Sequence, residues 1–136
     1  MRRGFLRRAR GFTLTELVVA VAIAAILALI AVPSYQETLR KSRRADAKVA
    51  LDDQANRLER YYAERNTYVD ATLSRATSPE GYYTLAITTQ SASGFTIKAT
   101  RKSTGPQAND DRCGDFTLNQ NGVQGKTGTG TVAECW

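Results

Sequence analysis

The chain has 136 residues, a length that corresponds to one small domain. It carries 19 lysine and arginine residues against 13 aspartate and glutamate residues, with no histidine and only two cysteines. Without histidine, the Ser-His-acid and Cys-His mechanisms and histidine-ligated zinc are excluded, and two cysteines cannot build a four-cysteine metal site. Neither GxxxxGK[ST] nor GxGxxG is present, so no phosphate-binding loop is expected. These features favour a protein that is not an enzyme and holds no cofactor.

Most of the excess positive charge lies in the first 11 residues. Five arginines and no acidic residue give this segment a charge of +5, whereas residues 12–136 hold 14 basic and 13 acidic groups. If the segment is removed, the remaining protein is nearly neutral. The basic composition therefore indicates targeting rather than a nucleic-acid partner. The five arginines are Arg2, Arg3, Arg7, Arg8 and Arg10.

The next segment, residues 12–32, is long and apolar enough to span a membrane. Eighteen of its 21 residues are apolar, and as a helix it extends ~31 Å, about the thickness of the hydrocarbon core. The run is longer than the ~7–15 residues of a signal-peptide core, which disfavours an ordinary signal peptide. The arginine-rich flank predicts a single pass through the inner membrane, with the amino terminus in the cytoplasm.

Glu16 is the one charged residue in this apolar run. An unpaired carboxylate in a membrane-spanning helix costs ~2–3 kcal/mol or more, so such groups are usually paired and functional. No lysine or arginine follows until Arg40, so the helix holds no cation that neutralises Glu16. The sequence therefore predicts a partner from elsewhere, and a new α-amino terminus on a neighbouring chain is a suitable cation.

The segment RGFTLTEL, from Arg10 to Leu17, resembles the class III signal of type IV prepilins. In that family a short basic leader and a glycine precede Phe-Thr-Leu-x-Glu and a hydrophobic helix. The resemblance implies that a prepilin peptidase cuts after Gly11 and N-methylates Phe12. Glu16 then becomes the fifth mature residue, the family's position for pairing with a neighbouring amino terminus. Pro33 stands where pilins commonly carry a helix-bending proline.

Beyond Pro33 the composition becomes polar, and helical periodicity continues to about Tyr62. Apolar residues recur there at spacings of four, four, three and four, which marks one face of a helix. That face comprises Ala47, Leu51, Ala55, Leu58 and Tyr62. The charges on the other faces are interpreted as a solvated surface or as subunit contacts. They include Arg43, Arg44, Asp46, Asp53, Arg57 and Arg60.

The last part of the chain reads as a small antiparallel sheet. Residues 82–89 and 95–101 are rich in β-formers and flank a turn, so they predict a hairpin. Residues 115–119 predict a third strand, and residues 65–81, 104–112 and 125–130 predict loops. The expected fold is α+β, with a long amino-terminal helix packed on a sheet of three or four strands.

The two cysteines, Cys113 and Cys135, lie outside the cytoplasm in this topology, so a disulfide is their expected state. It would close about 22 residues and contribute roughly 3 kcal/mol in the chain-entropy model. The segments Cys113-Gly114 and Cys135-Trp136 resemble the short, PilE-like branch of minor pilins. That branch also includes ComP-like receptors for DNA uptake sequences.

Two ligand-binding alternatives rest on the residues around the hairpin and the disulfide. Lys98, Arg101, Lys102 and Arg112 are the candidate DNA contacts, but acidic residues share their neighbourhood, which favours a mixed solvated surface. Calcium binding is the second alternative, although the acidic spacing does not fit an EF-hand loop. The candidate calcium ligands are Asn109, Asp110, Asp111 and Asp115.

We therefore expect three segments: a cleaved leader (residues 1–11), a membrane and filament-core helix (12–32) and an extracytoplasmic domain (33–136, with the disulfide region 113–135). The expected function is structural, as a minor subunit of a type IV pilus that serves motility, adhesion or DNA uptake. The expected partners are other pilin subunits, prepilin peptidase and the assembly platform. The chain would reside in the inner membrane before assembly and in the extracellular pilus afterwards. One alternative is a DNA-uptake-sequence receptor. The other is a type II secretion pseudopilin, and the paired cysteines near the carboxy terminus disfavour this second alternative.

Overall fold

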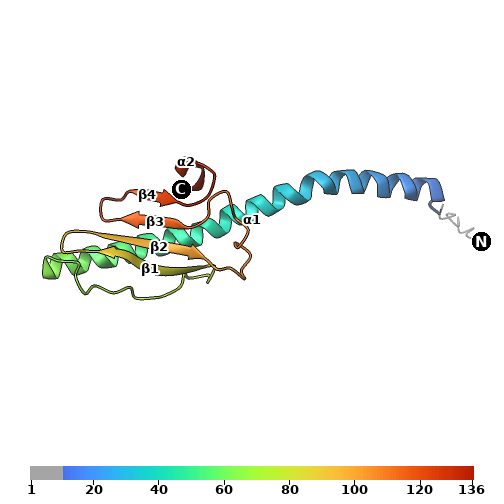
Figure 1. Cartoon of the computed structure of the whole chain (residues 1–136). Coiled ribbons are helices and arrows are strands. Elements are labelled where there is room, and N and C mark those ends of the chain that lie inside the picture. The colour runs from blue at the N-terminus through green and yellow to red at the C-terminus, as the bar shows by residue number, and fades with distance from the viewer. Residues whose placement is uncertain (1–10) are drawn as a thin grey trace, which may run out of the picture. The chain divides into compact units, whose positions relative to one another are not determined.

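The computed structural model describes residues 11–136, so the predicted leader up to Arg10 lies outside the described residues. The chain divides into two compact units, one up to Glu37 and one from Thr38 onward, and helix α1 contributes to both. The elements in chain order are α1 (Leu14–Arg65), β1 (Tyr83–Gln90), β2 (Phe95–Arg101), β3 (Phe116–Asn119), β4 (Gln124–Lys126) and α2 (Val132–Cys135), as labelled in Figure 1.

The first unit exposes apolar residues almost without interruption. An 18-residue stretch of α1 has a mean hydropathy of 2.8, is long and apolar enough to cross a membrane, and is not buried by the rest of the chain. Large side chains from Leu14 to Val32 are more than half exposed. A continuous apolar surface of this kind requires lipid or other apolar chains around it.

In the second unit, the sheet lies alongside the carboxy-terminal part of α1 (Figure 1). The predicted apolar helix face is confirmed at Ala47, Leu51 and Leu58, which are buried in the core. Ala55 and Tyr62, the other two residues of that face, are half-buried and pack against the same core.

The sheet is antiparallel with the strand order β1-β2-β3-β4, which confirms the α+β fold. Along β2, Phe95, Ile97 and Ala99 are buried and alternate with less buried neighbours, as the sequence pattern predicts. The predicted loop over residues 125–130 is partly wrong, because Gln124–Lys126 forms β4. Gly125 permits this pairing, since a Cβ there would collide with Thr117 Oγ across the strands.

The loop between α1 and β1 is fastened to α1 by two buried polar side chains. Asp46 accepts hydrogen bonds from Ser78 Oγ at 2.5 Å and from the Glu80 amide at 2.9 Å. Gln54 accepts from the Ser74 amide at 2.8 Å. The assignment of Asp46 to a solvated or subunit-contact face is therefore wrong, because its carboxylate is buried beneath the loop.

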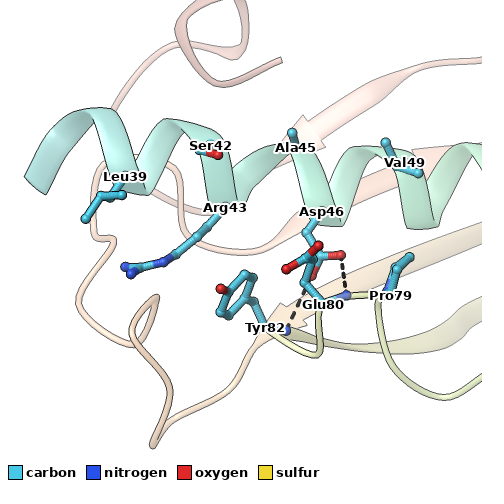
Figure 2. A pocket seen from close by; sticks show the side chains of 9 residues that line it. All are labelled: Leu39, Ser42, Arg43, Ala45, Asp46, Val49, Pro79, Glu80 and Tyr82. Carbon is cyan, nitrogen blue, oxygen red and sulfur yellow. Dashed lines mark hydrogen bonds between the residues drawn. The ribbon is translucent and has the colours of Figure 1, made fainter.

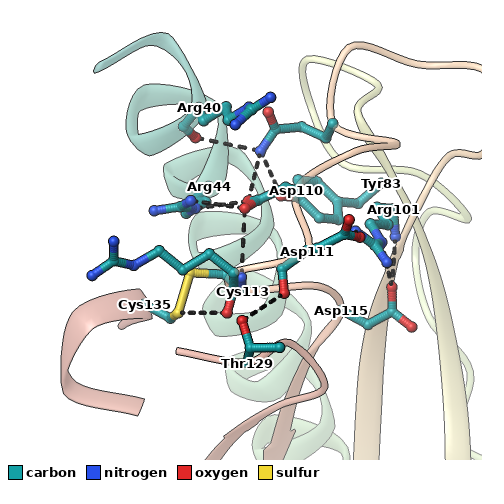
Figure 3. Close-up of polar contacts among 12 residues, drawn as sticks. Arg40, Arg44, Tyr83, Arg101, Asp110, Asp111, Cys113, Asp115, Thr129 and Cys135 are labelled. Atoms are coloured by element: carbon teal, nitrogen blue, oxygen red, sulfur yellow. Dashed lines mark hydrogen bonds and ion pairs between the residues drawn. A yellow bond between two sulfur atoms is a disulfide. The ribbon is translucent and has the colours of Figure 1, made fainter. Parts of the chain in front are cut away.

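A buried ion pair fastens α1 to the loop between β2 and β3 (Figure 3). Arg44 donates from Nε and Nη2 to the two carboxylate oxygens of Asp110, each at 2.7 Å, and the side chains are only 2% and 1% exposed. Gln107 donates to the Tyr83 hydroxyl at 3.0 Å, and burial raises the pKa of that hydroxyl. The assignment of Arg44 to a solvated or subunit-contact face is also wrong, because its guanidinium is buried against Asp110.

The disulfide between Cys113 and Cys135 is confirmed, with both residues buried and their Cα atoms 5.5 Å apart. Asp110 lies directly beside it, since Asp110 Oδ1 accepts the Cys113 amide at 3.4 Å. Trp136 packs edge-on against Phe116, with ring centroids 5.5 Å apart, and donates from Nε1 to the Gly125 carbonyl. The carboxy-terminal segment is thus held to β3 and β4 by aromatic, polar and covalent contacts.

Replacing Cys113 with serine should lower the free energy of unfolding by about 3 kcal/mol, because it opens a loop closed over 22 residues. Urea unfolding of a fragment that begins at Ser34 measures this, and the reduced wild-type fragment is the matched control. The reduced control should lose a similar amount. Free thiols detected in the native protein by labelling without reductant would contradict the disulfide.

Asp110→Ala should cost about 3–5 kcal/mol, because it removes the carboxylate that accepts two hydrogen bonds from the buried Arg44 guanidinium. The control Arg112→Ala breaks an exposed ion pair with Glu134 and should cost no more than ~1 kcal/mol. The double variant Arg44→Met/Asp110→Leu should regain much of the loss, since it removes both charges and keeps apolar volume. Equal losses of unfolding free energy in Asp110→Ala and Arg112→Ala would show that the buried pair contributes no more to stability than the exposed pair.

Candidate assembly and binding surfaces

The start of α1 is closed by a hydrogen-bonded pair, Thr13 and Glu16. Glu16 Oε2 accepts from the Thr13 amide at 2.9 Å and from Thr13 Oγ at 2.8 Å. In return, Thr13 Oγ accepts from the Glu16 amide at 3.3 Å. This reciprocal arrangement is a capping box. The Thr-x-x-Glu pattern signals it in the sequence, but the sequence interpretation considered only an external partner for Glu16.

Glu16 also lines a shallow groove of about 440 Å³ on the first unit. Its neighbours there are apolar apart from one threonine, so one carboxylate stands in apolar surroundings. The groove comprises Phe12, Thr15, Glu16, Val19, Ala20 and Ile23.

Gly11 and Phe12, the predicted processing residues, precede α1, and Phe12 is 89% exposed. Pro33 lies inside α1 and interrupts its hydrogen bonding, because proline has no amide hydrogen.

The structure pairs three of the four predicted DNA-contacting cations with carboxylates. Lys98 Nζ lies 2.9 Å from Asp115. Arg101 lies 3.0 Å from Asp111 and 3.9 Å from Asp115 (Figure 3). Lys98 and Arg101 thus share Asp115.

Arg112 lies apart from that group and pairs with Glu134 at 2.5 Å. Lys102 has no carboxylate partner within the described part of the chain, and its backbone amide donates to the Tyr82 carbonyl. The four residues therefore do not form one concentrated patch of unpaired positive charge, which strong phosphate binding requires.

The acidic residues considered for calcium are mostly engaged in the same ion pairs. Asp110 is buried against Arg44, and both Asp111 and Asp115 contact Arg101. Among residues 11–136, no three histidine, cysteine, aspartate or glutamate side chains gather in a way that could hold a metal ion. The described residues therefore give the calcium alternative no geometric support.

A surface groove of about 410 Å³ lies between α1 and the start of β1 (Figure 2). The Arg43 guanidinium lies 5.6 Å from the centre of the Tyr82 ring, and Asp46 accepts backbone hydrogen bonds on the same side. Leu39 and Val49 add apolar surface to the lining. A mixture of apolar, aromatic and arginine groups is typical of protein–protein contacts. The sequence interpretation assigned Arg43 to a solvated or subunit-contact face and did not identify this groove.

Two family models match the chain. Residues 33–117 match the model described as "Type IV minor pilin ComP, DNA uptake sequence receptor". Residues 6–32 match the prokaryotic N-terminal methylation motif. The two matches join at the residue where the sequence predicts that the extracytoplasmic domain begins.

Curated relatives and solved structures agree with these matches. Fimbrial protein EcpC of Eikenella corrodens is 32% identical over 121 residues, which cover 87% of this chain and 71% of EcpC. The major pilin PilA of Myxococcus xanthus is 36% identical over 73 residues, but the match spans only 33% of its length.

Two pilin structures share the fold. The minor pilin PilV of Neisseria meningitidis aligns with a TM-score of 0.57 and 25% identity, over 69% of this chain and 92% of PilV. A type IV pilin of Shewanella oneidensis aligns with a TM-score of 0.54 and 32% identity, over 71% and 97%. With its methylation motif, pilin fold and domain match, the chain belongs to the type IV pilin family, as a minor pilin.

Proposed function

We propose that the chain is cut after Gly11, methylated on Phe12 and assembled into a type IV pilus through the apolar part of α1. The observation that carries this proposal is the exposed apolar stretch of α1, which contains one acidic residue and lies within the matched methylation motif. An exposed surface of this kind suits lipid first and the helices of other pilins afterwards.

The domain division follows from the same reasoning. Residues 1–11 serve as a leader that stays in the cytoplasm, because positively charged flanks are retained there. Residues 12–32 cross the inner membrane once, and residues 33–136 fold outside it. The disulfide in the last segment supports this placement, because disulfides persist in oxidising compartments.

In the filament, Glu16 pairs with the α-amino group of a neighbouring pilin. Its position among apolar groove residues supports this role, because a carboxylate in such surroundings gains most from an opposite charge. Pro33 gives α1 a point at which the helix can bend during packing. The processing and assembly partners are prepilin peptidase, the assembly platform and other pilin subunits.

Pilins are structural proteins, and we assign no catalytic residue to this chain. DNA-uptake-sequence binding is the second candidate function, favoured by the description of the model that matches residues 33–117. The ion pairs at Lys98, Arg101 and Arg112 argue for weak, sequence-blind DNA contact from that surface. A role as a type II secretion pseudopilin is less well supported, since the relatives and structures named above are pilus proteins.

Intact-mass analysis of the protein from cell envelopes should show the loss of residues 1–11 and one added methyl group on Phe12. Gly11→Arg should block the cut, because we expect the peptidase site to admit only a small residue there, and Gly11→Ala is the control that should still be processed. A mature species of full length would overturn the processing proposal.

A fragment that begins at Ser34 should bind duplex DNA without sequence preference and only weakly, with a Kd of ~10⁻⁴–10⁻⁶ M or a larger value. Arg101→Ala and Lys102→Ala should then change the affinity no more than Arg60→Ala, a control that removes one exposed charge on α1. Gel-shift competition with scrambled duplexes measures both properties. A clear preference for one short sequence, lost in Arg101→Ala or Lys102→Ala, would favour the receptor function.

A further inference from the structure

The described chain contains two capping boxes of the same geometry, one at each end of the sequence. In α2, Thr131 is the N-cap, and Glu134 Oε2 accepts from the Thr131 amide at 2.8 Å and from Thr131 Oγ at 3.1 Å. In α1, Glu16 Oε2 accepts the corresponding bonds from Thr13 at 2.9 and 2.8 Å. The return bond from the glutamate amide to the threonine hydroxyl is 3.3 Å in both.

The two boxes differ at the second carboxylate oxygen. Glu134 Oε1 accepts a charge-assisted bond from Arg112 at 2.5 Å. The backbone of Thr131 and the side chain of Arg112 lower the pKa of Glu134 to about 2, so the box and the cation together favour the ionised carboxylate. Glu16 Oε1 has no corresponding cation among residues 11–136, although its Oε2 is bound in the same way.

The two carboxylate oxygens of Glu16 have different roles when the start of α1 lies in lipid. No water is present there to satisfy the Thr13 hydroxyl or the first amide groups of α1, so these groups need partners within the chain. The box pairs the Thr13 amide and hydroxyl and the Glu16 amide with one another and with one carboxylate oxygen. The Glu16 side chain is thereby held in one direction, with Oε1 left to receive a cation.

We propose that Thr13 is a positioning residue for pilus assembly, which fixes Glu16 so that Oε1 meets the α-amino group of a second pilin chain. The inference rests on the proposed function, because the cation is supplied only when a second chain arrives. At Glu134, Arg112 from the loop between β2 and β3 supplies the cation that the α-amino group supplies at Glu16. Thr15 does not share the role, since its hydroxyl contacts Thr13 Oγ at 3.2 Å and makes no bond to Glu16.

Three full-length variants in piliated cells test this role. Thr13→Val removes the hydroxyl at nearly constant shape, Thr13→Ser keeps it, and Thr15→Val is the matched control that removes a neighbouring hydroxyl. The readout is the amount of the protein in sheared filaments, divided by the amount of processed protein found by intact mass. This ratio separates assembly from cleavage at the nearby Gly11–Phe12 bond.

Thr13→Val should reduce the ratio by about fivefold, the equilibrium equivalent of the ~1 kcal/mol typical for loss of an N-cap. Thr13→Ser and Thr15→Val should remain near the wild-type value. Amide hydrogen exchange of the full chain in bilayer discs supplies a second measurement that does not depend on processing. The Glu16 amide should exchange faster in Thr13→Val and at the wild-type rate in Thr15→Val.

The outcomes separate this inference from the proposed function. Wild-type incorporation in Thr13→Val, or an equal loss in Thr13→Val and Thr13→Ser, would overturn the positioning role alone. An unchanged Glu16 exchange rate in Thr13→Val would overturn it as well. Absence of the wild-type protein from filaments would contradict the pilus role, and the positioning role would fall with it.

Discussion

The globular part of this pilin depends on the buried ion pair between Arg44 and Asp110. Two charges that are almost fully removed from water are tolerated only when their geometry is good and neighbouring groups satisfy the remaining lone pairs. The bidentate contact meets the first condition, and the Cys113 amide at Asp110 Oδ1 contributes to the second. Because Arg44 belongs to α1 and Asp110 lies three residues before Cys113, one interaction fixes where the disulfide-bounded segment lies on the helix. The loop before β1 is fastened to the same helix through Asp46.

The amino-terminal unit meets the opposite problem. Its apolar side chains are exposed, and Glu16, the acidic residue within its apolar stretch, must be accommodated among them. In both units a charged side chain is hydrogen-bonded by another residue of the same chain. In the globular unit the arrangement is closed, since both charges of the pair are present. At Glu16 the hydrogen bonds come from Thr13, and no cation among residues 11–136 pairs with the carboxylate.

The parts of the fold that could be predicted from the sequence are those with a local signal. Helical periodicity located Leu51 and Leu58 in the core, and alternation located β2 at its observed bounds. The burial of Arg44 carried no such signal, because its partner is 66 residues away and a charged residue has the same appearance in sequence whether it is solvated or paired. Strand β4 was not predicted, because its three residues include a central glycine and show no alternation of β-formers, and α2 was not predicted, because four residues make only about one helical turn.

Ion pairs between residues that are distant in the sequence also limit what the positive charge of the chain indicates about DNA binding. A phosphate that approaches Lys98 or Arg101 must compete with Asp115, which already contacts both cations. Part of the electrostatic gain is therefore offset by the loss of an existing ion pair, and the nearby carboxylates repel the phosphate as well. Since phosphate contacts supply most sequence-independent affinity, the surface is poorly suited to general DNA retention. Specific recognition at this surface would then depend on contacts with base edges, which carry sequence information that charge alone does not.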